Sequence, residues 1–166
     1  MTDGTQSPWA GTPLVFFPPK PGEPLIFVLI AARHEGKWIF VRHKDRDTFE
    51  MPAGHIEPDE TPFEAALREL YEETGTRDCV LELVSPYGVA EEGAPASFGL
   101  LYFAEVLELG ELPAFEIEER KLFESIPDRL TYPNIQPQLM KKVFSWLEEH
   151  LSPDTNPQCK ANGLSA

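Results

Sequence analysis

The chain has 166 residues, of which 42% are hydrophobic and 25% charged, the size and composition of one globular domain. Its 28 acidic residues outnumber its 14 lysines and arginines, which gives a formal net charge of −14 at pH 7. This balance excludes a protein that holds long nucleic acid or an anionic membrane through its overall charge, because both need clustered lysine and arginine.

Cysteine usage and hydropathy point to a cytoplasmic protein. Cys79 and Cys159 are too few for a disulfide framework and lie in no zinc-binding spacing. The longest apolar run, residues 25–32, is too short to cross a bilayer. No lysine or arginine precedes Lys20 and no hydrophobic stretch follows the start, so no signal peptide is indicated. We therefore expect no membrane partner.

Prolines and polar residues mark the two ends of the chain. Six prolines fall within residues 1–24, which predicts an extended arm or edge strand there. Residues 152–166 are polar and are expected to form a flexible tail. One domain, residues 25–151, remains between them. The arm could pack on its own sheet or on a second subunit, so the sequence leaves monomer and homodimer open.

The pattern of the domain predicts an α/β sandwich, a mixed sheet flanked by two helices. Residues 25–33 and 37–42 form two β-rich runs around Glu35-Gly36 and predict a hairpin whose first strand is buried on both faces. Further strands are expected at residues 80–89, 97–107 and 121–123, and a final helix at residues 137–151.

Residues 61–74 carry the strongest helix signal. Thr61 is the expected N-cap, Pro62 takes the first helical position and Glu64 completes a capping box. Gly75 stands where a left-handed C-terminal residue belongs. An apolar stripe repeats at three- and four-residue steps and is the expected buried face: Phe63, Ala66, Leu67 and Leu70.

Three glutamates gather on another side of this helix. At about 100° per residue, Glu69, Glu72 and Glu73 fall within one arc of roughly 100°. Like charges at these spacings cost a few tenths of a kcal/mol each, and the helix dipole disfavours anions in the last turns. A divalent cation would account for the cluster, and oxygen ligands favour Mg²⁺ or Mn²⁺ over zinc. The alternative is a solvated acidic helix face.

The stretch GHIEPDETPFEAALRELYEETGT, residues 54–76, resembles the Nudix box, G-x5-E-x7-R-E-U-x-E-E-x-G-U, where U is a bulky aliphatic residue. Thr76 departs from the aliphatic residue of the last position. The preceding Met51-Pro52-Ala53-Gly54 is similar to the family's Pro-Gly-Gly segment, with Ala53 in place of the first glycine. The other fixed positions match: Gly54, Glu60, Arg68, Glu69, Leu70, Glu72, Glu73 and Gly75.

The resemblance implies the Nudix fold and the hydrolysis of a nucleoside diphosphate linked to another group, with Mg²⁺, or alternatively Mn²⁺, as cofactor. It implies metal binding by Glu69, Glu72, Glu73 and the carbonyl of Ala53, with Glu72 and Glu73 also catalytic. The structural residues that it implies are Gly54, Glu60, Arg68 and Gly75, with Glu60 and Arg68 bracing the loop that orients the carboxylates.

A further glutamate outside the box serves as base or metal ligand in many members of this family. Glu116 is the favoured candidate here, and Glu118 or Glu119 are alternatives; each could equally be a solvated loop carboxylate.

Residues 33–46 form a basic segment just before the box. We hypothesise that Arg42, together with His43 or Lys44, contacts substrate phosphate. The alternative is a charged hairpin edge that prevents aggregation.

Residues 132–137, YPNIQP, are similar to the start of the final helix in MutT-type Nudix enzymes, whose asparagine reads an oxidised guanine. Asn134 is the matching candidate, because an amide can donate and accept at a purine edge together. The alternative is a helix-capping or turn asparagine. An apolar base pocket is hypothesised from four residues: Phe49, Met51, Tyr132 and Ile135.

These features predict a Mg²⁺-dependent pyrophosphohydrolase that converts a purine nucleoside triphosphate, with 8-oxo-dGTP as candidate, to the monophosphate and pyrophosphate. Its expected partner is a small nucleotide. Alternatives are an ADP-ribose or nucleotide-sugar pyrophosphatase, which Pro86 and Pro95 disfavour by their spacing from the box, and an RNA 5′-pyrophosphohydrolase. A catalytically silent nucleotide-binding module is the non-enzymatic alternative.

Overall fold

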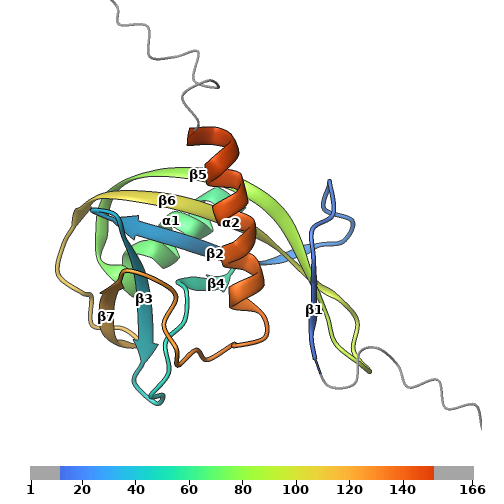
Figure 1. Cartoon of the computed structure of the whole chain (residues 1–166), viewed down its shortest axis with the longest axis horizontal. Helices are drawn as coiled ribbons and strands as arrows, with labels where there is room; N and C mark the ends of the chain where they lie inside the picture. The colour runs from blue at the N-terminus through green and yellow to red at the C-terminus, as the bar shows by residue number, and fades with distance from the viewer. Residues whose placement is uncertain (1–11, 152–166) are drawn as a thin grey trace, which may run out of the picture.

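A computed structural model describes residues 12–151 (Figure 1). The bounds of the strands and helices follow in chain order: β1 (Leu14–Phe16), β2 (Leu25–His34), β3 (Lys37–His43), β4 (Ala53–His55), α1 (Pro62–Thr74), β5 (Thr76–Ala90), β6 (Ser97–Leu109), β7 (Ile117–Phe123) and α2 (Gln136–Leu151). The expected tail and the first eleven residues of the expected arm lie outside this range.

The strands form one mixed sheet in the order β1-β5-β6-β2-β3-β7, with β4 paired to β2 beside this path. The β2–β6 pair is parallel and the remaining pairs are antiparallel. In Figure 1, α1 lies behind the sheet and α2 crosses its front. The predicted sandwich of a mixed sheet between helices is therefore confirmed.

Strand β2 is buried on both faces, as its continuous apolar run predicts. Alternate side chains of a strand point to opposite faces. Val28 and Ile30 belong to the core beneath α1, whereas Leu29 and Ala31 belong to the core beneath α2. The hairpin to β3 is also confirmed, and both of its turn residues have positive φ, 50° at Glu35 and 78° at Gly36, as a two-residue hairpin turn requires.

The ends of α1 agree with the sequence signals. The Thr61 hydroxyl accepts a hydrogen bond from the Glu64 amide at 3.2 Å, and the Glu64 carboxylate accepts one from the Thr61 amide at 2.8 Å. Gly75 has φ of 73° and donates its amide proton to the Tyr71 carbonyl. This reciprocal capping places the helix boundaries independently of the rest of the fold.

The expected buried face of α1 is partly wrong. Phe63 is 46% exposed and Leu67 39% exposed, so both lie at the rim. The residues that α1 buries are Ala65, Ala66, Leu70 and Thr74. The buried face of α1 is therefore displaced from the apolar stripe toward the side of the helix that bears Glu69 and Glu73, whose side chains are only 13% and 12% exposed.

Thr76, the departure from the Nudix pattern, is buried at the start of β5. The Thr74 hydroxyl donates to the Leu70 carbonyl at 2.5 Å, so it accepts from the Thr76 hydroxyl at 2.7 Å. This pairing satisfies the hydroxyl that replaces an aliphatic side chain, because a buried polar group without a partner would be costly.

Two strands begin earlier than the sequence predicts. β5 begins at Thr76 rather than residue 80, and β7 begins at Ile117 rather than residue 121. The missed part of β7 is charged because β7 is an edge strand, and strand propensity is weak there. Within the expected arm, β1 pairs with β5 and forms the other edge of the same sheet.

Candidate functional site

Two adjoining cavities open beside α1. The first has a volume of about 640 Å³ and reaches from β4 to the start of α2. The second has a volume of about 230 Å³ and lies along α1 and the start of β7. Four glutamates line both cavities and form what we call the acidic junction: Glu57, Glu69, Glu73 and Glu116.

Gly54 sets how closely β4 approaches α1. A Cβ atom at this position would lie 2.0 Å from the Glu69 carboxyl carbon, so any other residue would displace the Glu69 side chain from its present position. β4 is held on the other side by its pairing with β2, in which Gly54 is opposite Val28. The backbone before the helix is thereby pressed against the carboxylates of the helix.

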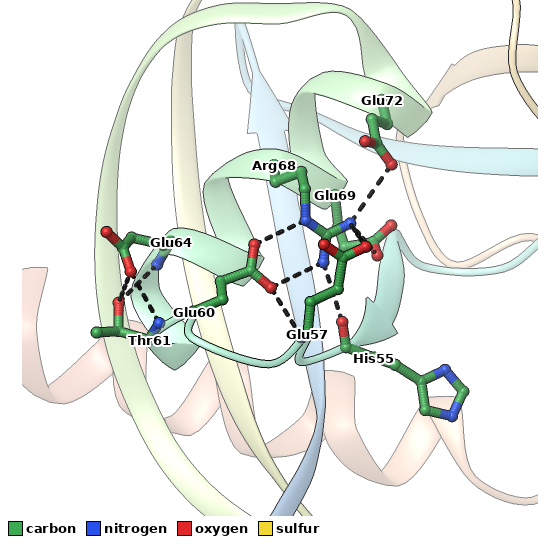
Figure 2. Close-up of polar contacts among 8 residues, drawn as sticks. All are labelled: His55, Glu57, Glu60, Thr61, Glu64, Arg68, Glu69 and Glu72. Carbon is green, nitrogen blue, oxygen red and sulfur yellow. Dashed lines mark hydrogen bonds and ion pairs between the residues drawn. The ribbon is translucent and has the colours of Figure 1, made fainter.

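Arg68 holds the loop before α1 to the helix (Figure 2). Its Nε and Nη2 donate to the two oxygens of Glu60 at 2.7 and 3.0 Å. Its Nη1 donates to Glu69 at 2.7 Å and, at 3.5 Å, to Glu72, while Nη2 also reaches the His55 carbonyl. Hydrogen bonding to Glu60, ahead of that to Glu69, raises the pKa of Arg68 above its ordinary value despite its partial burial. The guanidinium therefore stays charged and orients several acceptors at once.

Glu73 is a nearly buried carboxylate in acidic surroundings. Its pKa is raised to about 9, first by burial and then by the charges of Glu69, Glu50 and Glu116, while a hydrogen bond of 3.1 Å from the Ala53 amide opposes this shift. Burial also raises the pKa of Glu69, although Arg68 opposes this shift. Two desolvated carboxylates side by side are unfavourable unless they are protonated or share a cation.

The donor set fits a hard divalent cation. Carboxylates of Glu69, Glu72 and Glu73 and the nearby backbone of Ala53 offer oxygen atoms, the ligands that Mg²⁺ and Mn²⁺ prefer. In residues 12–151 no three histidine, cysteine or acidic side chains are already arranged around one point as metal ligands. Glu69 and Glu72 instead face Arg68 in this structure.

Of the three candidate loop glutamates, Glu116 lines both cavities. Glu118 is exposed, and Glu119 pairs with Arg42 at 3.2 Å. Glu116 is also near enough to Glu73 to raise its pKa. The structure thus brings Glu116 to the acidic junction and leaves the other two outside the lining of either cavity.

Arg42 does not line either cavity. Its Nε contacts Glu119 and its Nη1 donates to the Arg46 carbonyl at 3.1 Å. The first cavity is instead lined by His43 and Arg46. Neighbouring residues of a strand face opposite sides, and the pairing of β3 with β7 shifts register between Arg42 and His43, which separates their directions.

Glu50 is a cavity residue that the sequence analysis missed. It is 6% exposed and contacts His43 Nε2 at 3.0 Å and Arg46 Nη1 at 3.1 Å. Burial raises its pKa, opposed by the charges of His43 and Arg46. A single glutamate between Phe49 and Met51 carries no sequence signal, because its partners come from another strand and the following loop.

The segment before α2 also differs from expectation. Asn134 is exposed and contributes only its backbone carbonyl, which accepts from Gln138. Of the four hypothesised pocket residues, Phe49 and Met51 pack in the core and two line the cavity. The cavity side of this segment consists of Tyr132, Ile135, Gln136 and Leu139. This three- and four-residue spacing was a helical signal that could have identified the face.

Comparisons connect this chain with known proteins. The family model of the NUDIX domain matches residues 22–147. YtkD of Bacillus subtilis strain 168, provisionally assigned as an 8-oxo-dGTP diphosphatase, is 36% identical over 105 residues, which cover 63% of this chain and 65% of YtkD. An RNA pyrophosphohydrolase of Bartonella tribocorum is 44% identical over 62 residues, which cover 32% of this chain and 36% of that protein. The chain thus spans less than two thirds of the length of either curated relative.

A solved structure extends the similarity across most of the domain. The Bacillus subtilis pyrophosphohydrolase BsRppH superimposes with a TM-score of 0.68 at 29% identity, covering 80% of this chain and 90% of BsRppH. The sheet and its two helices, of which α1 is the box helix, are therefore those of a known family. Within residues 12–151, neither helix has the length and apolar character needed to span a bilayer.

Proposed function

The chain belongs to the NUDIX family, and we propose that it is a Mg²⁺-dependent pyrophosphohydrolase that cleaves a purine nucleoside triphosphate, such as 8-oxo-dGTP, to the monophosphate and pyrophosphate. Nudix hydrolases generally use a divalent metal and act on small nucleotides. The observation that carries the proposal is the acidic junction, which lies in the wall of a cavity of about 640 Å³ that can hold a nucleoside. We place this activity in the cytoplasm.

The residues in and around the acidic junction have separate tasks in this proposal. Glu69, Glu72, Glu73 and the Ala53 carbonyl would hold Mg²⁺, which when bound neutralises phosphoryl oxygens and lowers the pKa of water. Glu116, which lines the same two cavities, would accept the proton of the attacking water at its carboxylate. Arg68 keeps the carboxylates oriented through its bonds to Glu69 and Glu72.

The first cavity divides into an apolar and a polar side, which supports a nucleotide as the substrate. His43 lies 4.0 Å from Glu73 of the acidic junction, Arg46 lines the same cavity, and both are placed to contact phosphate. The apolar side suits a base and is lined by Phe27, Leu29, Tyr87, Val89, Ile135 and Leu139. We retain Arg42 and Asn134 as predicted substrate contacts only if binding moves them, since neither lines the cavity here.

A second candidate is removal of pyrophosphate from RNA 5′ ends. The 44% identity over 62 residues with the RNA pyrophosphohydrolase of Bartonella tribocorum favours it. The chemistry at the triphosphate would be the same, so only the group beyond the first nucleotide distinguishes the two. The net charge of −14 disfavours extended contacts with an RNA chain.

One substrate panel tests these candidates. The protein is incubated with Mg²⁺ and 8-oxo-dGTP, dGTP, dATP, ADP-ribose or 5′-triphosphate RNA, and pyrophosphate, phosphate and nucleotide products are measured. We expect pyrophosphate and a monophosphate from the purine triphosphates, and no product without Mg²⁺. Turnover confined to ADP-ribose or RNA would replace the proposed substrate, and turnover of none would favour a binding module.

Arg68→Ala is expected to lower kcat about 10- to 100-fold, the usual effect of removing a residue that orients metal ligands. Circular dichroism at the assay temperature establishes that the variant remains folded. The matched control is Arg77→Ala, because Arg77 pairs with Glu108 at 3.7 Å and both side chains are 60% exposed. If the two variants were equally active, Arg68 would not be required to orient the metal ligands.

A further inference from the structure

Gln136, the first residue of α2, is buried and yet lines the first cavity. Its side chain is part of a residue that is 2% exposed. Its Oε1 accepts a hydrogen bond of 2.9 Å from the Met51 amide. Within residues 12–151 its Nε2 makes no hydrogen bond. In the same range, no side-chain nitrogen or oxygen is both fully shielded from solvent and without a hydrogen-bond partner. The Nε2 group therefore keeps some exposure, and the first cavity is the space that Gln136 lines.

The Met51 amide decides which way the Gln136 amide points. A backbone N–H can only donate, so the oxygen of Gln136 must face it. The flipped amide would set two donors against each other and leave the Met51 N–H unpaired in the core, which is costly. Gln136 therefore presents a donor, and not an acceptor, to whatever fills the cavity.

The backbone around Gln136 is also held in place. Its amide donates to the Tyr132 carbonyl at 3.0 Å, and the Leu139 amide donates to the Ile135 carbonyl at 3.3 Å. The same turn sets Tyr132, Ile135 and Leu139 along the cavity wall. The donor thus stands among apolar side chains on the side of the cavity that suits a base.

The two other buried polar residues of the first cavity, Glu50 and Tyr87, do not offer such a fixed, uncompensated donor. Glu50 is engaged by both His43 and Arg46. The Tyr87 hydroxyl lines the cavity, is part of a residue that is 5% exposed, and makes no hydrogen bond within the described range. A hydroxyl can either donate or accept, however, so Tyr87 does not select between acceptors and donors on a ligand.

We propose that Gln136 determines base specificity by donating from Nε2 to a carbonyl oxygen of the substrate base. This inference rests on the proposed function of the same cavity. A 6-oxopurine, such as guanine, 8-oxoguanine or hypoxanthine, carries an acceptor oxygen where adenine carries an amino group. The amino group would face the Gln136 donor and leave both unpaired, so the site favours 6-oxopurine nucleotides over 6-aminopurine nucleotides.

The first test uses the unaltered protein and two substrates that differ at position 6 of the purine, dITP and dATP. We expect kcat/KM for dITP to exceed that for dATP at least tenfold, the effect of one unpaired buried donor. Because this ratio needs no variant, it does not depend on whether a substituted protein folds. Equal values, or a preference for dATP, would overturn the proposal.

The second test uses Gln136→Met, which has similar length and no donor. We expect the dITP/dATP ratio to fall to within about threefold of unity, mainly through loss of dITP turnover. Gln138→Met is the matched control, because Gln138 is exposed and contacts only the Asn134 carbonyl with its side chain; its ratio should stay unchanged. A Gln136→Met protein that folds and keeps the full ratio would contradict the assignment.

A binding measurement separates this inference from the proposed function. If the protein hydrolyses no triphosphate, the proposed function fails, and base selection is then read from the rise in Tm that dGMP and dAMP produce. A larger rise with dGMP that is lost in Gln136→Met would still support the role of Gln136. Equal rises with the two nucleotides would reject it.

Discussion

Replacing Glu73 by glutamine is expected to lower kcat about 10³-fold at saturating Mg²⁺, measured with the triphosphate that the unaltered protein hydrolyses fastest. A bound metal ion contributes several kcal/mol to such a reaction, and each 1.4 kcal/mol corresponds to about a tenfold change in rate. Glutamine keeps the shape of Glu73 and can still accept the hydrogen bond from the Ala53 amide. The loss would therefore come from the missing charge.

Glu148→Gln is the control for the Glu73 variant, because it makes the same chemical change at an exposed position of α2 that lines neither cavity. We expect its kcat to remain within about twofold of the unaltered protein. A Glu73→Gln protein that retains most of its activity would exclude Glu73 as a metal ligand of the reaction.

Thermal stability without metal is expected to fall as the pH rises from about 5 to 9. The pKa of Glu73 is raised to about 9 in the folded protein, whereas an exposed glutamate titrates near 4.5. The folded state thus binds the proton more tightly than the unfolded state. The stabilisation from protonated Glu73 is complete below about pH 4.5 and is lost as the pH rises toward 9. The total change is on the order of a few kcal/mol.

This change in stability is measured as Tm in EDTA and in Mg²⁺ at pH 6 and pH 8.5. Each kcal/mol corresponds to roughly 2–4 °C for a domain of this size. Mg²⁺ binds the ionised carboxylates, so we expect its gain in Tm to be larger at pH 8.5. In EDTA at pH 8.5, Glu73→Gln should exceed the unaltered protein in Tm by several degrees, while Glu148→Gln should not. If Glu73→Gln had the lower Tm under these conditions, the ionised Glu73 side chain would not destabilise the folded protein as proposed.

The box helix was predictable because its signals are local. Thr61 and Glu64 cap each other across one turn, and Gly75 closes the helix with a left-handed backbone angle that glycine adopts without strain. The spacing of Glu69 and Glu73 on one side also follows from helix geometry alone. The first strand was equally predictable, since a continuous apolar run such as residues 25–33 must be covered on both faces.

The inward face of α1 and the contents of the first cavity were not predictable in this way. Phe63 and Leu67 are apolar at helical spacing, yet the packing of Ala65 and Ala66 on the sheet left them at the rim. Glu50 contacts His43 and Arg46, which precede it closely in sequence, but only the path of the chain after β3 turns the three side chains toward one another.

The sequence by itself determined the box helix, its acidic side and the layers of the sandwich, because caps, helical spacing and apolar runs act within a few residues. Only the tertiary structure decided whether a candidate residue or one of its sequence neighbours faces the cavity. A register shift in β3 brought His43 rather than Arg42 to its wall, and the Met51 amide fixed Gln136 while Asn134 stayed outside. Such choices depend on register and packing between segments distant in sequence, and one step along a strand or helix turns a side chain to another face.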